Sequence, residues 1–191
     1  MINTPSRYDF VGSFLRPQTL KDAKLDYQNG KITQEEFDEI VNEEIRKLVN
    51  KQKELGFPII TDGEFRRTFW HLDFMWGLEG VEHKDNGNGL PFNGEPAFVE
   101  DTYLVGKIRA KKHPFVEYYK FLKQFEDENT VAKYTIPAPA QTLLQMVFPE
   151  NLETTRKFYP TNEELIQDIA KAYQDIIRQF FDAGCRNLQL D

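Results

Sequence analysis

The segment Phe57-Pro58-Ile59-Ile60-Thr61-Asp62-Gly63-Glu64-Phe65-Arg66-Arg67 joins a short apolar run to a cluster of charges. The run Phe57–Thr61 predicts a buried strand, and two carboxylates follow it on either side of a glycine. Acids at the carboxyl end of a strand are typical of the place where α/β enzymes carry their active sites. A polar turn, in which the two arginines pair with the acids, is the alternative, and the spacing does not choose between them.

An amphipathic helix is predicted before this strand. Thr33-Gln-Glu-Glu36 matches a capping box, in which the threonine and the last glutamate satisfy each other's free backbone amides. Apolar residues then recur at helical spacing as far as Val49. Gly56 and Pro58 are residues that end helices, so the strand follows at once.

The same order returns near the end of the chain. Thr161-Asn-Glu-Glu164 is a second predicted capping box, and an apolar helix face runs from Leu165 to Phe180. Gly184 ends this helix, and the strand Asn187–Leu190 leads directly to Asp191. A capped helix, a glycine, a strand and an acid therefore occur twice.

The remaining segments complete an alternating pattern. Further strands are predicted at Tyr8–Phe14, Leu104–Ile108 and Val131–Ile136, and further helices at Thr19–Gln28, Pro114–Glu126 and Gln141–Phe148. Residues 83–103 are rich in Asn-Gly turn signals and are predicted to be an irregular insertion. Strands that alternate with amphipathic helices predict an α/β fold with a parallel sheet.

Four core strands, near Phe10, Ile59, Thr135 and Leu188, are half the number in a TIM (β/α)8 barrel. We therefore expect residues 1–191 to form a single partial barrel domain that supplies about the first four βα units. A half barrel leaves two open sheet edges, which folded proteins normally avoid. The chain is then expected to be a fragment, or its edges are covered by another copy or another chain.

Composition limits the classes of function. The formal net charge of -7 argues against nucleic acid as a partner, because phosphate binding needs a basic field. No apolar stretch approaches the roughly 20 residues of a membrane span, and the first residues lack a signal-peptide core. We expect a cytoplasmic protein. The three histidines and the single cysteine, His71, His83, His113 and Cys185, show no metal-ligand spacing.

Two other places at predicted strand ends could hold a ligand. Val11-Gly12-Ser13 lies where the first predicted strand ends. Its glycine allows the backbone to approach a ligand closely, and its serine offers a hydroxyl and an amide donor. Asp191 ends the last strand as Asp62 ends an earlier one.

These stretches together resemble a known family. The motifs Val11-Gly-Ser-Phe14, Asn29-Gly-Lys-Ile-Thr-Gln-Glu-Glu-Phe37, Glu43-Glu-Ile-Arg-Lys-Leu-Val49, Gln52-Lys-Glu-Leu-Gly56, Thr61-Asp-Gly-Glu64 and Leu188-Gln-Leu-Asp191 resemble the catalytic domain of cobalamin-independent methionine synthase. The resemblance extends in order over essentially the whole chain. It is strongest to the shorter, single-domain bacterial type.

The resemblance implies a fold, a reaction and a set of substrate contacts. The fold would be a (β/α)8 barrel, and the reaction would move a methyl group from 5-methyltetrahydrofolate, a folate donor, to the thiol of homocysteine. Zinc would bind that thiol and lower its pKa. Val11, Gly12 and Ser13 would hold the homocysteine carboxylate and backbone, and Glu64 and Asp191 would take its ammonium group.

The resemblance assigns neither a catalytic residue nor a metal ligand to this chain. The family's zinc ligands and its catalytic histidine follow the strand at which the sequence ends, so we expect no zinc site here. Two other hypotheses stay open. One is a non-catalytic half barrel stabilised by self-association through its open sheet edges, that is, a homo-oligomer. The other is a related barrel enzyme, a thiol methyltransferase or a decarboxylase-like protein, that uses Asp62 and Glu64 as acid and base.

Overall fold

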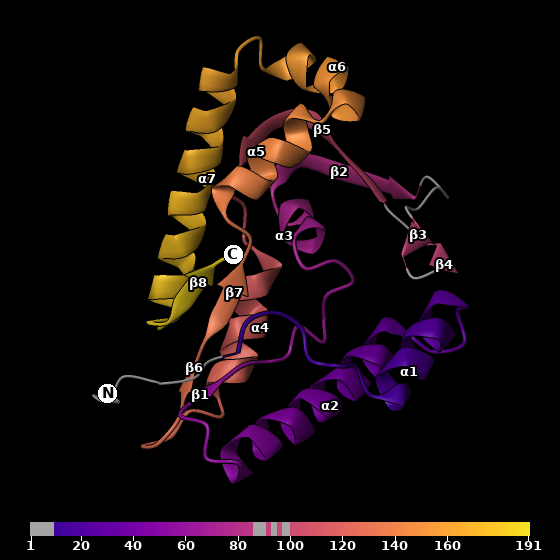
Figure 1. Ribbon diagram of the computed structural model, residues 1–191, viewed down its shortest axis with the longest axis vertical. Coiled ribbons are helices and arrows are strands. Elements are labelled where there is room, and N and C mark those ends of the chain that lie inside the picture. Colours follow the sequence, from indigo (N-terminus) through magenta and orange to yellow (C-terminus); the bar gives the residue numbers. More distant parts are fainter. Residues whose placement is uncertain (1–9, 86–90, 93–94, 97–99) are drawn as a thin grey trace. The chain divides into compact units, whose positions relative to one another are not determined.

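The computed structural model describes residues 10–85, 91–92, 95–96 and 100–191, which form an α/β fold (Figure 1). Its helices are α1 (Gln18–Gln28), α2 (Gln34–Glu54), α3 (Leu72–Trp76), α4 (Pro114–Lys123), α5 (Pro139–Val147), α6 (Pro149–Phe158) and α7 (Asn162–Asp182). Its strands are β1 (Ile59–Ile60), β2 (Glu79–Asp85), β3 (Pro91–Phe92), β4 (Glu95–Pro96), β5 (Glu100–Arg109), β6 (Val131–Ala132), β7 (Tyr134–Ile136) and β8 (Leu188–Leu190).

The strands of the described residues form four two-stranded sheets. β1 pairs with β6 in parallel, with Ile59 opposite Val131. β7 pairs with β8, and Tyr134 N donates to Asn187 O while Asp191 N donates to Ile136 O. The pairings join strands far apart in sequence, as expected for an α/β protein. A half barrel of four units is not among these sheets and stays a prediction.

The chain divides into two compact units, which are described separately. The first contains residues 1–70, 118–135 and 185–189, and the second contains residues 71–117, 136–184 and 190–191. In the first unit α1 lies beside α2 (Figure 1). The α2 residues Val41, Ile45 and Val49 are fully buried, as is Ile60 of β1. Burial of aliphatic side chains of this size stabilises each by about 1.5–3 kcal/mol.

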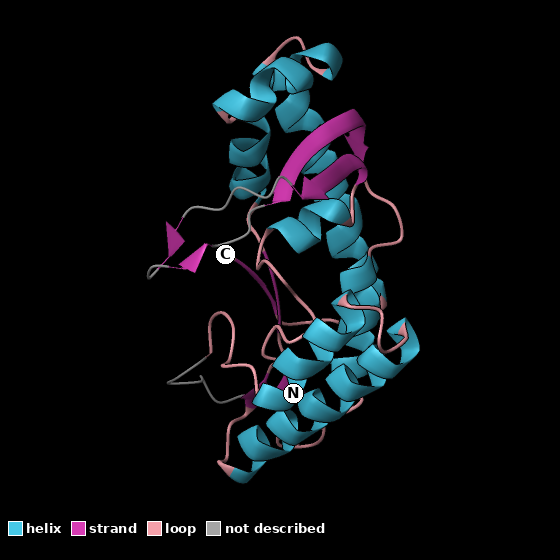
Figure 2. Ribbon diagram, turned by 90° about the vertical axis from the view of Figure 1, so that its right-hand side faces the viewer, coloured by secondary structure: helices cyan, strands magenta, loops and turns pink. Residues whose placement is uncertain are grey.

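In the second unit α7 carries the largest share of the core. Its buried residues are Leu165, Ile169, Ala172, Tyr173, Ile176 and Phe180. The ring of Tyr173 lies 5.1 Å from that of Phe74 in α3. β2 and β5 form a two-stranded antiparallel ribbon in this unit (Figure 2). The helix face predicted from Leu165 to Phe180 is thus confirmed, except that Ile166 and Ile177, which were predicted to belong to it, are exposed.

Both helices predicted from threonine caps form where expected. Thr33 Oγ1 accepts a hydrogen bond from Glu36 N, and Glu36 Oε2 accepts one from Thr33 N, so the capping box is complete. Thr161 Oγ1 accepts from Glu164 N at the start of α7. The helices α3 and α6 were not predicted, although Pro149 occupies the first position of α6, where proline is favoured.

The strand predicted at Tyr8–Phe14 is wrong for Phe10–Phe14, which are irregular, while Tyr8 and Asp9 lie outside the described residues. Gly12 has a φ of +82°, a left-handed conformation that interrupts extended backbone. Single hydrogen bonds hold this segment instead of a ladder. Phe14 N donates to Gly63 O over 3.1 Å, and Lys133 Nζ donates to the carbonyl of Phe10.

The segment predicted to be irregular, residues 83–103, has regular ends. His83 pairs with Thr102 and Lys84 with Asp101 in the β2–β5 ribbon, and β3 pairs with β4. Residues 86–90, 93–94 and 97–99 lie outside the described part of the chain. The strand predicted at Leu104–Ile108 is confirmed within β5, whereas β2, β3 and β4 were not predicted.

Candidate functional site

The turn after β1 has an unusual backbone conformation. Gly63 has a φ of +65° and Glu64 a φ of +57°, and Glu64 is the only non-glycine residue with positive φ in the described part of the chain. A non-glycine residue in this region costs about 1–3 kcal/mol, so other contacts must hold it there. One is the hydrogen bond of 2.9 Å from Glu64 N to Asp62 Oδ1.

The helix α2 fixes the point at which the turn begins. Gln52 of α2 is only 2 % exposed. Its amide accepts from Thr61 N over 3.0 Å and donates to Thr61 O over 2.9 Å. A β-carbon on Gly63 would lie 2.5 Å from Leu48 Cδ2 of the same helix, so this close approach requires glycine. The packing of α2 therefore determines where Glu64 lies.

The carboxylate of Glu64 is the centre of a buried polar cluster, and the residue is 4 % exposed. Its Oε1 accepts from Arg67 Nη1 over 3.1 Å and from Thr135 Oγ1 over 3.0 Å. Its Oε2 accepts from Ser13 Oγ over 2.7 Å. A carboxylate offers about four acceptor positions. Three are therefore filled by described residues, and the fourth lies on Oε2, the oxygen that Ser13 contacts.

Two arginines support this turn. Arg67 is 3 % exposed, and its Nη2 donates to Thr135 O over 2.5 Å and to Thr135 Oγ1 over 3.1 Å. Arg16 Nη2 donates to the carbonyls of Glu64, at 3.1 Å, and of Arg67, at 2.8 Å. The turn is thus bonded both to β7 and to the segment that follows Ser13.

Charge in the cluster is balanced within the protein. Burial lowers the pKa of Arg67, but the nearby Tyr134, Asp62 and Glu64 outweigh this effect and raise it, so the guanidinium stays charged. Burial, followed by the charge of Asp62, raises the pKa of Tyr134 well above its ordinary value. The Arg67 guanidinium lies over the Tyr134 ring, 5.3 Å from its centre.

The other two charged residues of the turn, Asp62 and Arg66, do not form with the described residues the ion pairs expected of a polar surface turn. Asp62 is 4 % exposed, and its Oδ2 is buried with no hydrogen-bond partner in the described structure. The contacts of Arg66 are made with other residues. Its Nη2 donates to Asn42 Oδ1, and its guanidinium lies 5.0 Å from the centre of the Tyr118 ring. The turn therefore contains two buried carboxylates, Asp62 and Glu64, and one buried arginine, Arg67.

The structure brings together only some of the residues predicted for the site. Ser13 and Glu64 are in direct contact, although 51 positions apart. Val11 is 68 % exposed, and Gly12 has left-handed backbone. Asp191 belongs to the second unit, where its backbone N donates to Ile136 O and its backbone O accepts from Ala138 N.

Gln52, Thr135 and Arg16 were not predicted as residues of the site. All three act through hydrogen bonds to residues at least nine positions away, and such bonds leave no periodic pattern. For Thr135 a weak signal exists, because a polar residue in a fully buried strand needs a partner.

No residue set in the described part of the chain fits a zinc ion. Groups of three or more His, Cys, Asp or Glu side chains that could hold a metal are absent among these residues. His113 is buried, and its Nε2 lies 2.9 Å from Phe74 O. Burial raises the pKa of the Cys185 thiol, so this cysteine is a poor source of thiolate. We therefore derive no step through zinc.

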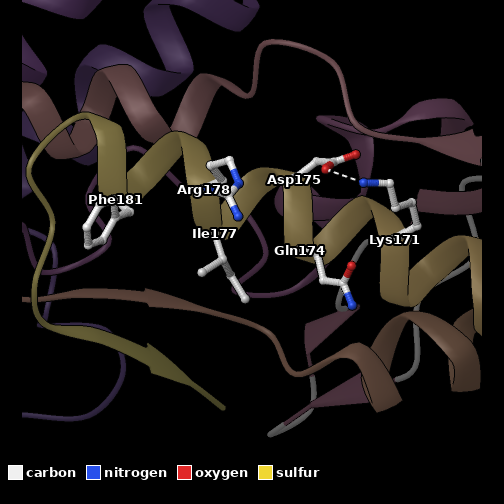
Figure 3. Close-up of a pocket in the computed structure, with 6 residues that line it drawn as sticks. All are labelled: Lys171, Gln174, Asp175, Ile177, Arg178 and Phe181. Carbon is white, nitrogen blue, oxygen red and sulfur yellow. Dashed lines mark hydrogen bonds and ion pairs between the residues drawn. The ribbon is translucent and has the colours of Figure 1, made fainter.

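The outer face of α7 carries a separate depression, lined by Lys171, Gln174, Asp175, Ile177, Arg178 and Phe181 (Figure 3). Lys171 and Asp175 form an ion pair of 2.7 Å there and satisfy each other's charge. The depression contains none of the residues that were predicted for the site. Among the described helices, none is both long and apolar enough to cross a membrane.

Comparison with known proteins identifies relatives over the whole chain. YxjH of Bacillus subtilis, an uncharacterized protein, is 40% identical over 187 residues, which cover 98% of this chain and 48% of that protein. The 5-methyltetrahydropteroyltriglutamate–homocysteine methyltransferase of Thermotoga petrophila is 32% identical over 185 residues, 95% of this chain and 23% of that protein. The chain thus spans about half the length, or less, of these curated relatives.

Solved structures show the same relationship. The putative vitamin-B12-independent methionine synthase of Listeria monocytogenes is 41% identical, with a TM-score of 0.76 over 98% of this chain and 52% of that one. A B12-independent methionine synthase from Shewanella sp. W3-18-1, solved in complex with selenomethionine, is 23% identical with a TM-score of 0.59, a likeness of fold alone; it covers 84% of this chain and 44% of that one.

The family model described as the catalytic domain of cobalamin-independent synthase matches residues 8–191. This match covers nearly all of the described residues, including the turn that carries Glu64. The chain therefore belongs to the cobalamin-independent synthase catalytic-domain family.

Proposed function

We propose that this chain binds the amino acid end of homocysteine through Glu64 and Ser13, as part of a homocysteine methyltransferase. The observation that carries the proposal is the Glu64 carboxylate, which is buried and held by three donors, while one acceptor position on Oε2 is not filled by any described residue. An ammonium group supplies the missing donor and brings a compensating charge. Hydrogen bonds between charged partners in a partly desolvated place are about twice as strong as neutral ones.

The neighbouring segment suits the other end of an amino acid. Val11, Gly12 and Ser13 are proposed to hold its carboxylate and backbone, because left-handed backbone such as that of Gly12 occurs in turns whose amides bind anions. The exposure of Val11 and the direct contact of Ser13 with Glu64 support this assignment. The role proposed for Asp191, a second contact to the ammonium group, rests on the family resemblance alone.

The proposed reaction is methyl transfer to sulfur. The homocysteine thiol loses its proton, a bond forms between sulfur and the methyl carbon, and the bond from that carbon to N5 of a 5-methyltetrahydrofolate-type donor breaks. N5 of the tetrahydrofolate-type product takes up a proton, which balances the one lost by the thiol. Family membership and the similarity to relatives such as the Thermotoga petrophila methyltransferase support this reaction class. The complete reaction and a cytoplasmic location are proposals, and no residue of this chain is assigned to proton transfer.

A (β/α)8 barrel, with this chain as about the first four βα units of one partial domain, is the fold we propose for the complete catalytic domain. The parallel β1–β6 pair supports it. The likeness to the Listeria monocytogenes structure, which extends over about half of that chain, also supports it.

The decisive experiment is calorimetric titration of the chain with L-homocysteine and L-methionine, comparing wild type with Glu64→Gln. Loss of the carboxylate charge is expected to raise the Kd by about tenfold to a hundredfold, the value of a hydrogen bond between charged groups. Glu128→Gln, which makes the same charge change at an exposed position of the same unit, should bind as wild type does.

Equal affinity of wild type and Glu64→Gln would contradict the assignment of Glu64 to the ammonium group. It would favour the hypothesis that Asp62 and Glu64 act as acid and base in another barrel enzyme. Absence of amino acid binding in the wild type, together with a stable homo-oligomer by light scattering, would favour the non-catalytic half barrel.

A further inference from the structure

We propose that Arg67, together with Thr135, is the positioning residue that allows this site to select ligands with an α-ammonium group. This inference rests on the proposed function, because it concerns how Glu64 is presented to an amino acid. Neither side chain is proposed to touch the ligand. Both act through Oε1 of Glu64 and leave Oε2 for the ligand.

The first step is the rotational freedom of the Glu64 side chain. A glutamate side chain has three rotatable bonds, and a free carboxylate exchanges its two oxygens by rotation. Arg67 Nη1 and Thr135 Oγ1 both donate to the same oxygen, Oε1, over 3.1 and 3.0 Å. Two donors on one oxygen distinguish it from the other and direct Oε2 toward Ser13.

The second step is the rigidity of the two donors. Arg67 Nη2 also donates to the carbonyl and to the hydroxyl of Thr135, so the guanidinium is bonded to strand β7 and to Glu64 at once. The planar fork of arginine can make such paired bonds, whereas a lysine ammonium is a point charge on a flexible stem. Arg67 N also donates to Glu64 O over 3.0 Å, which ties the backbone of the turn to the same residue.

The third step is the charge. An arginine beside the carboxylate compensates part of its charge, and a cation that binds to Glu64 must approach from the side that Arg67 does not occupy. That side carries Ser13, which is exposed, whereas Arg67 and Thr135 are 3 % and 6 % exposed. The arrangement therefore determines the direction from which an ammonium group is accepted.

The test measures discrimination rather than affinity alone. Calorimetry of the full chain gives the Kd for L-homocysteine and for 4-sulfanylbutanoate, which is homocysteine without its amino group. The ratio of the Kd for 4-sulfanylbutanoate to the Kd for L-homocysteine reports the ammonium contact. We expect Arg67→Gln to lower this ratio by about tenfold or more, with little change in the affinity for the analogue.

A second pair of variants tests the same role with a smaller disturbance. Thr135→Val keeps the shape of the side chain but removes the donor to Oε1, and it should lower the ratio by about threefold to tenfold. Thr135→Ser keeps the hydroxyl and should restore discrimination. Arg67→Lys should recover only part of it. Arg178 is an exposed arginine on α7, so Arg178→Gln is the matched control and should leave the ratio of the two dissociation constants unchanged.

The outcomes separate this inference from the proposed function. If wild type discriminates and both Arg67→Gln and Thr135→Val discriminate equally well, the positioning role is wrong while the function stands. If the variants weaken both ligands equally, Arg67 and Thr135 have a merely structural role, and the inference is again wrong. If wild type shows no preference for the amino group, the proposed function fails and the inference fails with it. Should Arg67→Gln not fold, as judged by circular dichroism, the two Thr135 variants decide.

Discussion

At the scale of the residue, Glu64 combines three costs that a surface acid avoids. It is buried, it is charged, and its backbone is left-handed, with a φ of +57°. Each cost is offset by a specific contact: hydrogen bonds to the carboxylate from Ser13, Thr135 and Arg67, and the bond from its amide to Asp62. Strained residues that are held so completely are typical of functional sites.

The backbone strain at Glu64 can be measured separately from the loss of its side chain. Glu64→Ala and Glu64→Gly both lose the carboxylate, but only glycine adopts a positive φ without penalty. We expect Glu64→Gly to be more stable than Glu64→Ala by about 1 kcal/mol in urea unfolding. The same pair at Glu43, an exposed position within α2, should show the opposite order because alanine favours helices. The same order at both positions would show that residue 64 is not strained.

At the scale of the element, α2 is the helix that positions the site. Its amino end is closed by a complete capping box, and its carboxyl end carries Gln52, which bonds both backbone groups of Thr61. Glu35 and Glu36 in the first turn and Lys51 and Lys53 in the last turn oppose the helix dipole. Local sequence signals and tertiary contacts therefore agree along this helix.

The capping box at the start of α2 should contribute measurably to stability. We expect Thr33→Ala to lower the free energy of unfolding by about 1 kcal/mol, because Glu36 N loses its acceptor. Thr33→Ser keeps that acceptor and should stay within a few tenths of a kcal/mol of wild type. Chemical denaturation measured by circular dichroism is the assay. Equal losses in the two variants would mean that the cap hydroxyl is not the stabilising group.

At the scale of the whole molecule, ligand binding should stabilise the part of the chain that contains Glu64. A ligand that binds only the folded state at a hundred times its Kd adds about 2.7 kcal/mol. For a chain of this size the Tm should rise by about 5–10 °C. Differential scanning calorimetry with L-methionine is the measurement. At the same ligand concentration the rise should shrink to about 1–5 °C for Glu64→Gln, whose Kd is expected to be about tenfold to a hundredfold higher, and it should also be smaller with the analogue that lacks the amino group. An equal rise in Glu64→Gln would locate the binding elsewhere in the molecule.

Much of the secondary structure was determined by the sequence itself. The capping threonines and apolar periodicity located α2 and α7, and the short apolar runs located β1 and β8. The single strand predicted over Val131–Ile136 is divided into β6 and β7, which pair with different strands. These signals are local, since a cap acts within one helical turn and a hydrophobic face repeats every few residues. The resemblance also led to the family that the comparisons show.

What only the tertiary structure decided was the environment of the carboxylates. The sequence left open whether Asp62 and Glu64 belong to a polar turn or to a site, because their neighbours in space come from distant segments. Ser13 and Thr135 lie 51 and 71 positions from Glu64, and Arg67 reaches Thr135 across 68 positions. Packing of α2 against β1 buries the turn, and only burial makes these hydrogen bonds necessary. The spacing of two acids on either side of a glycine therefore does not predict which distant residues will contact them.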